Sequence, residues 1–441
     1  MGTEVLLLDA KLDRGIERTI SAALREFRPD AVGISALTAE SFLAHKLAAA
    51  VKAAEPGMPV VIGGPYATSD PEGALGDAAL DVAVIGEGEE TFAELLRLII
   101  SEGPRWKDPA LLRAVNGLAF RGEASVERSF PRAPITDLDS LPFPAWDLID
   151  YRKFWAFPSM ATLGERPYLP LFASRGCPYH CAFCHNIFGK TFRPRSPENV
   201  ADEVAVLHGL GVRDIEVLDD IANCDPERFD GTLQLLLDRG LHSKLSFPNA
   251  LRGDLLRESS AELLRSVGTG EISIAVETAS ERLQRYLGKH LSLPKVSRAI
   301  DMLADRRIFT RGFFILGLPT ETPAELRATI EFAAASRLHL AMFFTPNPFP
   351  GTEFREMFRR AGKLPAAEKS IDYEYFGAPF NGGTMSDREY RLLYRWAYCR
   401  FYLSPSRVGR IVRDGPMGVR MLRRAAGLFR NYASFSSLRE D

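Results

Sequence analysis

The sequence lacks the features that mark an exported, membrane-spanning or nucleic-acid-binding protein. Its five cysteines are an odd number, so they do not form a complete disulfide framework. No apolar run approaches the ~20 residues of a membrane-spanning helix, and the N-terminus has no basic leader. The formal net charge of -2 gives no overall attraction to nucleic acid or lipid. We therefore expect a cytoplasmic globular protein, and 441 residues allow two or three domains.

Three of the five cysteines lie within eight residues, as C-x3-C-x2-C: Cys177, Cys181 and Cys184. Thiolates on so short a loop can converge on one metal centre. Structural zinc and iron–sulfur sites usually use four cysteines, so a set of three leaves one coordination position open for a small molecule. The triplet alone leaves zinc open as an alternative, with a fourth ligand from His180, His185 or Cys224.

The first 100 residues alternate between strand and helix patterns. We expect strands at 5–8, 31–35, 59–62 and 81–85, helices at 16–27, 41–54 and 89–100, and a hairpin at 117–128. Continuous apolar strands joined by helices predict a doubly wound, Rossmann-like parallel sheet. Ligands bind beyond the carboxyl ends of such strands, where the sequence has Ser35, Thr38, Gly63, Gly64, Gly86, Glu87 and Gly88. The alternative is that these glycines only turn strands into loops.

The alternation resumes after residue 166 with a new count. Strands are expected at 168–174, 213–219, 244–248, 271–277, 310–316 and 340–345, with helices at 197–209, 226–238, 259–266, 294–307 and 322–336. Six βα repeats fit a partial (β/α)6 barrel better than an eight-fold one. Polar or glycine residues follow the strand ends, where barrel sites lie: Asp219, Asp220, Arg252, Glu277, Gly317 and Glu321. Ordinary loop chemistry is the alternative for any one of them.

The order C-x3-C-x-aromatic-C, with Phe183 as the aromatic, resembles the signature of the radical S-adenosylmethionine (radical SAM) family. The resemblance implies that Cys177, Cys181 and Cys184 hold a [4Fe–4S] cluster whose open iron chelates SAM. An electron from that cluster splits SAM and generates a 5′-deoxyadenosyl radical. The resemblance also implies a SAM site formed by Phe183, Asp219, Asp220, Arg252, Glu277, Gly317 and Glu321.

The segments 29–35, 63–68 and 86–91 resemble the cobalamin-binding domain that precedes many radical SAM barrels. This resemblance implies that Ser35, Thr38, Gly63, Gly64, Gly86, Glu87 and Gly88 bind cobalamin. The sequence departs from the pattern twice. Lys11 stands where other cobalamin proteins have the histidine of D-x-H-x-x-G, and the match begins one strand–helix unit late.

We therefore expect a cobalamin-type domain at 1–140, a linker at 141–165, a radical SAM barrel at 166–352 and a helical region at 353–441. Ten arginines and one acid lie between Arg391 and Arg430, with apolar residues interleaved. Three interpretations of this segment are open: it rests on an anionic membrane surface, it covers the mouth of the barrel, or it presents a solvated basic face.

The resemblance implies an enzyme that acts on an unactivated carbon of a small-molecule substrate, most directly by cobalamin-dependent methyl transfer. Its electron donor would be a flavodoxin or ferredoxin, and no nucleic acid is expected as a partner. One alternative is a radical rearrangement, cyclisation or oxidation without methyl transfer. Another is a non-catalytic metal-binding or sensory protein.

Overall fold

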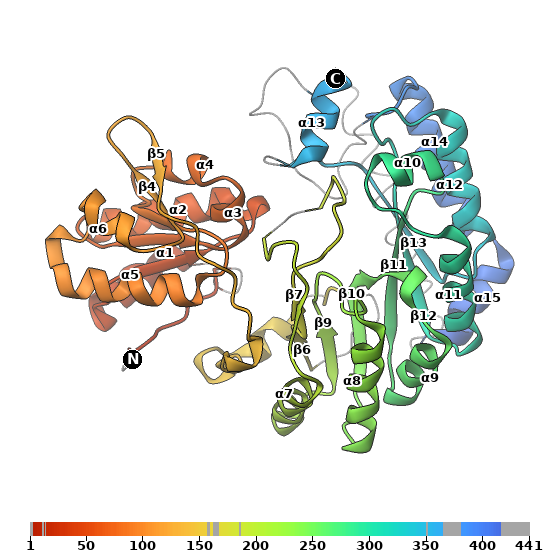
Figure 1. The fold of residues 1–441 in the computed structure, drawn as a ribbon, viewed down its shortest axis with the longest axis horizontal. Coiled ribbons are helices and arrows are strands. Elements are labelled where there is room, and N and C mark those ends of the chain that lie inside the picture. Colours follow the sequence, from red (N-terminus) through yellow and green to blue (C-terminus); the bar gives the residue numbers. More distant parts are fainter. Residues whose placement is uncertain are drawn as a thin grey trace. The chain divides into compact units, whose positions relative to one another are not determined.

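The computed structural model describes residues 3–10, 13, 15–156, 159–161, 167–184, 187–349, 352–364 and 381–415. The chain divides into two compact units, one formed mainly by residues up to Thr136 and the other mainly by residues from Trp155 onward (Figure 1). Among the described helices, none is both long and apolar enough to cross a membrane.

The first unit is built on a five-stranded sheet with the order β1-β2-β3-β4-β5. Strands β1 to β3 are parallel, whereas β4 and β5 form an antiparallel hairpin added beside β3. The strands are β1 (Val32–Ser35), β2 (Val60–Gly63), β3 (Val82–Val84), β4 (Leu118–Arg121) and β5 (Val126–Arg128). The helices are α1 (Ile16–Phe27), α2 (Ser41–Ala54), α3 (Gly64–Ser69), α4 (Pro71–Leu75), α5 (Gly88–Glu102) and α6 (Pro109–Ala114). The predicted parallel sheet and hairpin are confirmed.

Both faces of this sheet are buried, because successive side chains of a strand point to opposite sides. Val60 and Ile62 pack with a cluster that includes Leu24 of α1 and Ala48 of α2. Val61, between them, belongs to a second cluster that includes Leu95 of α5. The continuous apolar strands of the sequence are explained by this two-sided burial.

The strand expected at residues 5–8 is wrong. Residues 3–9 form no strand, and Val5, Leu6, Leu7 and Leu8 are 39 to 52% exposed. A short apolar run becomes a strand only when a neighbouring strand supplies its hydrogen bonds, and the sequence pattern cannot show whether one does.

The second unit contains a six-stranded sheet with the order β13-β12-β11-β10-β9-β6, in which all neighbours are parallel. Its strands are β6 (Tyr168–Leu171), β9 (Asp214–Val217), β10 (Lys244–Leu251), β11 (Glu271–Glu277), β12 (Phe309–Ile315) and β13 (Leu340–Phe344); β7 (Ser174–Arg175) and β8 (Arg193–Pro194) form a separate pair. The helices are α7 (Pro197–Gly209), α8 (Pro226–Asp238), α9 (Glu258–Val267), α10 (Glu281–Tyr286), α11 (Leu293–Asp305), α12 (Pro323–Ala335), α13 (Glu353–Arg360), α14 (Asp387–Tyr402) and α15 (Pro405–Asp414). All six expected strands exist, and their sequential order is the one that successive βα repeats produce.

The helices of the repeats begin where the sequence places a capping side chain followed by proline. Ser196, Asp225 and Thr322 accept hydrogen bonds from the first backbone N–H groups of α7, α8 and α12. Proline at the first helical position loses no hydrogen bond and has a backbone angle suited to the helix. Helices α8, α9, α11 and α12 lie in a row along the sheet (Figure 1).

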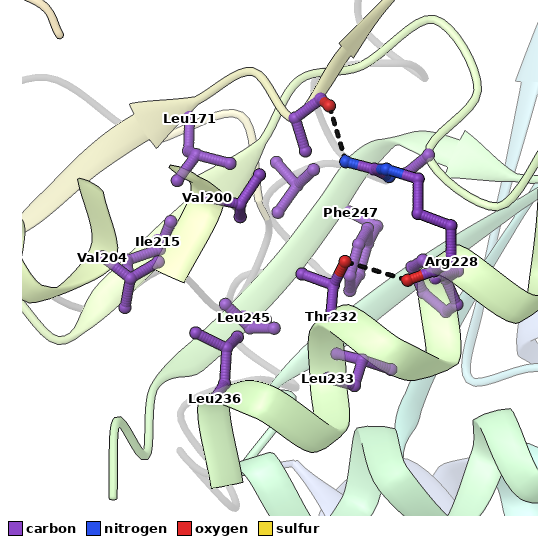
Figure 2. Close-up of a pocket in the computed structure, with 14 residues that line it drawn as sticks. Leu171, Val200, Val204, Ile215, Arg228, Thr232, Leu233, Leu236, Leu245 and Phe247 are labelled. Atoms are coloured by element: carbon purple, nitrogen blue, oxygen red, sulfur yellow. Dashed lines mark hydrogen bonds between the residues drawn. The ribbon is translucent and has the colours of Figure 1, made fainter. Parts of the chain in front are cut away.

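An apolar cavity of about 40 Å³ lies between the sheet and helices α7 and α8 (Figure 2). Its lining comes from the sheet, for example Ile215 and Leu245, and from Val204 of α7 and Leu236 of α8. Arg228 reaches over it to donate a 2.8 Å hydrogen bond to the carbonyl of Ala173. The cavity is therefore a packing gap within the core rather than a site for polar chemistry.

Four tyrosines spaced by four residues on α14 form hydrogen bonds to the backbone of the larger sheet, three of them to β13, the strand at one edge of that sheet. Tyr394 and Tyr398 both donate to the carbonyl of Phe343, at 2.6 and 3.2 Å. The Tyr402 hydroxyl exchanges hydrogen bonds with the backbone N–H and carbonyl of Ala341, and Tyr390 donates to the carbonyl of Leu316. The helix thus satisfies an edge that would otherwise be open. Residues 387–414 therefore cover the sheet edge with one face, while Arg391, Leu392 and Arg395 of α14 are exposed.

Candidate active site

The cysteine loop begins beside two carboxylates at the end of β9. Asp219 is 2% exposed and accepts hydrogen bonds from the Ala173 N–H, at 2.7 Å, and from the Ser174 hydroxyl. Burial raises the pKa of Asp219 to about 6. Asp220 accepts from the N–H of Gly176, whose φ of +81° is in the left-handed region. The two carboxylates therefore have different environments. Asp219 binds the base of the cysteine loop, while Asp220 is less buried and binds Gly176, the residue before Cys177.

The other side of the loop is fixed by the segment after α10 and by α13. The Ala182 N–H donates to the carbonyl of Leu287 at 2.9 Å, and its own carbonyl accepts from Phe354 at 3.0 Å. Gly288 has φ +67°, and a Cβ there would lie 2.5 Å from the carbonyl oxygen of His180. Phe183 packs edge-on against Phe354, with ring centroids 6.2 Å apart. The cysteine loop is thus held by backbone contacts at several points.

The three thiols lie close enough to influence one another. Burial raises the pKa of Cys181, and the nearby Cys177 raises the pKa of both Cys181 and Cys184. Among the described residues, no three His, Cys, Asp or Glu side chains are placed to hold one metal ion together. A zinc ion needs all its ligands within about 2.3 Å of a single point, whereas the cysteines of a cluster each bind a different iron. Three neighbouring thiols suit a cluster that leaves one iron open, and the zinc alternative is not tested, because its candidate ligand His185 lies outside the described residues.

Glu277 ends β11 in a strained conformation beside a buried cation. It has φ +66° and is 6% exposed, and its Oε1 lies 3.1 Å from Nζ of Lys289. Lys289 Nζ also lies 5.7 Å from the centroid of the Phe183 ring. Three other non-glycine residues with positive φ lie at the end of β10, after α10 and after β12: Ala250, His290 and Thr320. Such strain gathers at functional sites, where the surrounding structure maintains it.

Arg252, expected at the SAM site, is bound on several sides by protein. Its guanidinium stacks 3.8 Å over the ring of Tyr179 in the cysteine loop and donates to Asp254 and to the carbonyls of Lys289 and His290. Asn223 exchanges hydrogen bonds with the Arg252 backbone, and the neighbouring Cys224 lies within electrostatic range of Cys177. Arg252 therefore ties the loop to β10. Of the two histidines considered with this loop, His180 is exposed and His185 lies outside the described residues.

The turn after β12 is organised by Glu321. This residue is fully buried, and its Oε2 accepts hydrogen bonds from the N–H groups of Gly317, at 2.7 Å, and Leu318, at 3.1 Å. Burial raises the pKa of Glu321 to about 8, so its carboxyl is mainly protonated at neutral pH. Gly317 has φ +88°. In this structure Glu321 shapes the turn, and Gly317 gives the turn its left-handed bend.

In the first unit, the residues expected to bind cobalamin lie at one edge of the sheet. Ser35 and Gly63 end the paired strands β1 and β2, and Gly86 and Gly88 follow β3. Gly64 has φ +83°, and a Cβ there would lie 2.8 Å from the Ser35 hydroxyl, so only glycine lets these loops approach so closely. The Thr38 hydroxyl lies 3.4 Å from that of Ser69, and Glu87 accepts a hydrogen bond from the Ile135 N–H.

Two family models match the chain. The model of the B12 binding domain matches residues 1–96, and that of the radical SAM superfamily matches residues 171–333. These ranges contain the glycine-rich edge and the cysteine loop described above. This chain is a radical SAM protein with a B12-binding domain.

Curated relatives align over most of this radical SAM chain. An uncharacterized methyltransferase of Pyrococcus horikoshii is 29% identical, covering 91% of this chain and 85% of the relative. The cytidylyl-2-hydroxyethylphosphonate methyltransferase of Streptomyces wedmorensis is 28% identical, covering 77% and 69%. The anaerobic magnesium-protoporphyrin IX monomethyl ester cyclase of Rubrivivax gelatinosus is 29% identical, covering 82% and 63%.

Among solved structures, the radical SAM methyltransferase TsrM of Kitasatospora setae, with tryptophan and a SAM analogue bound, superposes with a TM-score of 0.69. The identity is 18%, and the match covers 93% of this chain and 84% of TsrM. At this identity the likeness shows that the two proteins share a fold.

Sequence reasoning did not single out two features that lie near the candidate site residues. Lys289 stands in a segment read as a loop, and nothing in the pattern reveals that its ammonium is buried beside Glu277 and the cysteines. Leu37 and Phe42, which flank Thr38 in the B12-binding domain, are 50% and 81% exposed. The sequence could have pointed to Phe42, because it is an apolar residue at the start of the helix that follows the carboxyl end of a strand.

Proposed function

We propose that this protein is a cobalamin-dependent radical SAM methyltransferase acting on an unactivated carbon of a small molecule. When bound, a [4Fe–4S] cluster supplies the electron that cleaves SAM, and cobalamin carries the methyl group. The proposal depends most on one observation: a rigidly held three-cysteine loop lies beside Asp220 and Glu277 in a chain that also contains a B12-binding domain.

The residues of this chain have distinct tasks in the proposal. Cys177, Cys181 and Cys184 hold the cluster, and Asp220 accepts a hydrogen bond from the SAM ammonium. Glu277 accepts hydrogen bonds from the two ribose hydroxyls of SAM, because the two oxygens of a carboxylate can accept both hydrogen bonds at once. Asp219, Arg252 and Glu321 maintain the loops rather than contact the substrate. In the B12-binding domain, the glycines let the corrin approach the backbone, and Leu37 and Phe42 offer it apolar contact.

The methyltransferase relatives support methyl transfer, and the cyclase relative supports the alternative of a radical outcome without it. The two differ in their coproducts. A methyl group taken from SAM leaves S-adenosylhomocysteine, whereas reductive cleavage leaves 5′-deoxyadenosine and methionine. We expect the anaerobically reconstituted enzyme, given SAM, reductant and substrate, to form S-adenosylhomocysteine and 5′-deoxyadenosine together. Formation of 5′-deoxyadenosine without S-adenosylhomocysteine would favour rearrangement, cyclisation or oxidation.

In this proposal the electron donor is a flavodoxin or a ferredoxin. The cytoplasmic location of the protein stays a prediction. Peripheral membrane contact through the arginine-rich tail is the last part of the proposal. The exposed Arg391, Leu392, Arg395 and Leu403 support it, because they mix cationic and apolar side chains. Flotation with anionic liposomes tests it, and failure of the protein to float would remove membrane contact from the account.

A further inference from the structure

Lys289 is a buried cation next to the cysteine loop. Its side chain is 13% exposed, and that of its partner Glu277 is 8% exposed, with 3.1 Å between Nζ and Oε1. Lys289 also faces the Phe183 ring at 5.7 Å, and Cys181 and Cys184 lie within electrostatic range of its ammonium. Its positive charge is therefore near both the loop that would hold the cluster and the carboxylate that would hold the SAM ribose.

The backbone fixes this position. Residues 287 and 288 are joined to the cysteine loop by the Ala182–Leu287 hydrogen bond and by the close approach of Gly288 to His180. The Lys289 N–H donates to the carbonyl of Gln284 at 3.0 Å, and its own carbonyl accepts from Arg252. Movement of this backbone segment is therefore restrained, which holds the base of the Lys289 side chain beside the cysteine loop.

A charge in this place acts on a cluster mainly through its reduction potential. The cluster gains one negative charge when it accepts an electron, and potentials depend on net charge, burial and the surrounding charges. Water screens an exposed charge far more than a buried one. Lys190 provides a comparison within the chain, since it acts on Cys184 more weakly than Lys289 does and donates to the carbonyl of Tyr179 at 2.9 Å.

We infer that Lys289 and Glu277 couple SAM binding to electron uptake. In the absence of SAM, Glu277 partly neutralises Lys289. When Glu277 accepts hydrogen bonds from the ribose hydroxyls of SAM, its ion pair with Lys289 weakens. The ammonium then stabilises the reduced cluster more strongly. The electron comes from a low-potential one-electron donor of the ferredoxin or flavodoxin class. This inference rests on the proposed function, which assigns the cluster to the cysteines and the ribose to Glu277.

The test is a redox titration of the reconstituted full-length protein, followed by electron paramagnetic resonance of the reduced cluster, with and without SAM. We expect Lys289→Gln to shift the midpoint potential to more negative values, and Lys289→Arg, which keeps the charge, to stay near the wild type. Lys190→Gln should produce a smaller shift than Lys289→Gln. The difference between wild type and Lys289→Gln should grow when SAM is added.

The Glu277→Gln variant gives a second redox titration in which Lys289 is unchanged. Removal of the counter-charge should raise the potential in the absence of SAM and reduce the further change on SAM addition. The inference is overturned if Lys289→Gln titrates at the wild-type potential, if Lys190→Gln shifts it equally, or if Glu277→Gln leaves it unchanged. If Lys289→Gln does not assemble a cluster, the Glu277→Gln result decides. Failure of the wild type to assemble a cluster or form 5′-deoxyadenosine would instead overturn the proposed function.

Discussion

The carboxylate of Asp219 accepts a 2.7 Å hydrogen bond from the backbone N–H of Ala173, forty-six residues earlier in the chain. The same carboxylate binds the Ser174 hydroxyl, so one buried side chain fixes the start of the cysteine loop. The loop proposed to hold the cluster is therefore positioned by a side chain that is not one of its cysteines.

Gly288→Ala should prevent cluster binding. The added Cβ would lie 2.5 Å from the His180 carbonyl oxygen, at a φ of +67° that already disfavours alanine. Gly240→Ala is the matched control, because Gly240 has a similar φ of +65° but no atom within 4 Å of its Cβ position. We expect the iron content after reconstitution to fall severalfold only in Gly288→Ala, while both variants lose about 1 kcal/mol of stability from backbone strain. Equal iron in the two variants would contradict this role of Gly288.

Glu321 should make the protein less stable as the pH rises from about 4.5 to 8. Its folded-state pKa is raised to about 8 by burial, above the usual carboxyl value, so the folded state keeps a proton that the unfolded state has lost. The unfolded state binds fewer protons in this window, and the free energy of unfolding therefore falls with increasing pH. Glu321→Gln removes this titration, and we expect the fall in thermal midpoint between pH 6 and 8.5 to be smaller in this variant. A wild type and variant with parallel pH profiles would show that Glu321 does not titrate in that range.

The tyrosines of α14 should contribute to stability through their hydroxyls. Tyr398→Phe removes a donor to the Phe343 carbonyl, and Tyr402→Phe removes both hydrogen bonds to the Ala341 backbone. We expect each change to cost about 1 kcal/mol, and more where a buried backbone group is left unpaired. Tyr286→Phe, at a position that is 40% exposed, is the control and should be nearly neutral. The measurement is the thermal unfolding midpoint, and no loss in either α14 variant would contradict the assigned role.

Phe42 should support cobalamin binding without supporting the fold. Its side chain is 81% exposed, so Phe42→Ala removes little from the core, while contact with the corrin would be worth roughly 2 kcal/mol, or about thirtyfold in affinity. Ile100→Ala on α5, also exposed, is the control. Equilibrium binding of cobalamin followed by its visible absorbance would test this. Equal cobalamin affinity of Phe42→Ala and Ile100→Ala would show that the corrin does not contact Phe42.

Much of the architecture could be predicted from the sequence because its signals are local. Helices α1 and α2 match the expected ranges, and the six strands of the larger sheet lie where apolar runs stand between helical patterns. The exception is residues 5–8, whose state depends on a partner strand that a local pattern cannot reveal.

The site could be predicted only as a set of positions. The sequence indicated that Asp219, Asp220, Arg252, Glu277 and Glu321 follow strand ends, but not which of them point into loops. That division depends on long-range hydrogen bonds, such as those of Asp219 to Ala173 and of Arg252 to Lys289. The burial of Lys289 depends in the same way on Phe183 of the cysteine loop and on Glu277 at the end of β11. Such side-chain environments leave no periodic pattern in the sequence.

The most direct test of the central claim is the formation of 5′-deoxyadenosine from SAM under anaerobic reduction, compared among wild type, Cys181→Ala and Cys399→Ala. Cys399 lies on α14, outside the cysteine loop, and serves as the matched control. The account predicts 5′-deoxyadenosine from the wild type and Cys399→Ala, and its loss in Cys181→Ala. Production of 5′-deoxyadenosine by Cys181→Ala at the wild-type level, or its absence in a wild type that contains a full cluster, would contradict the account.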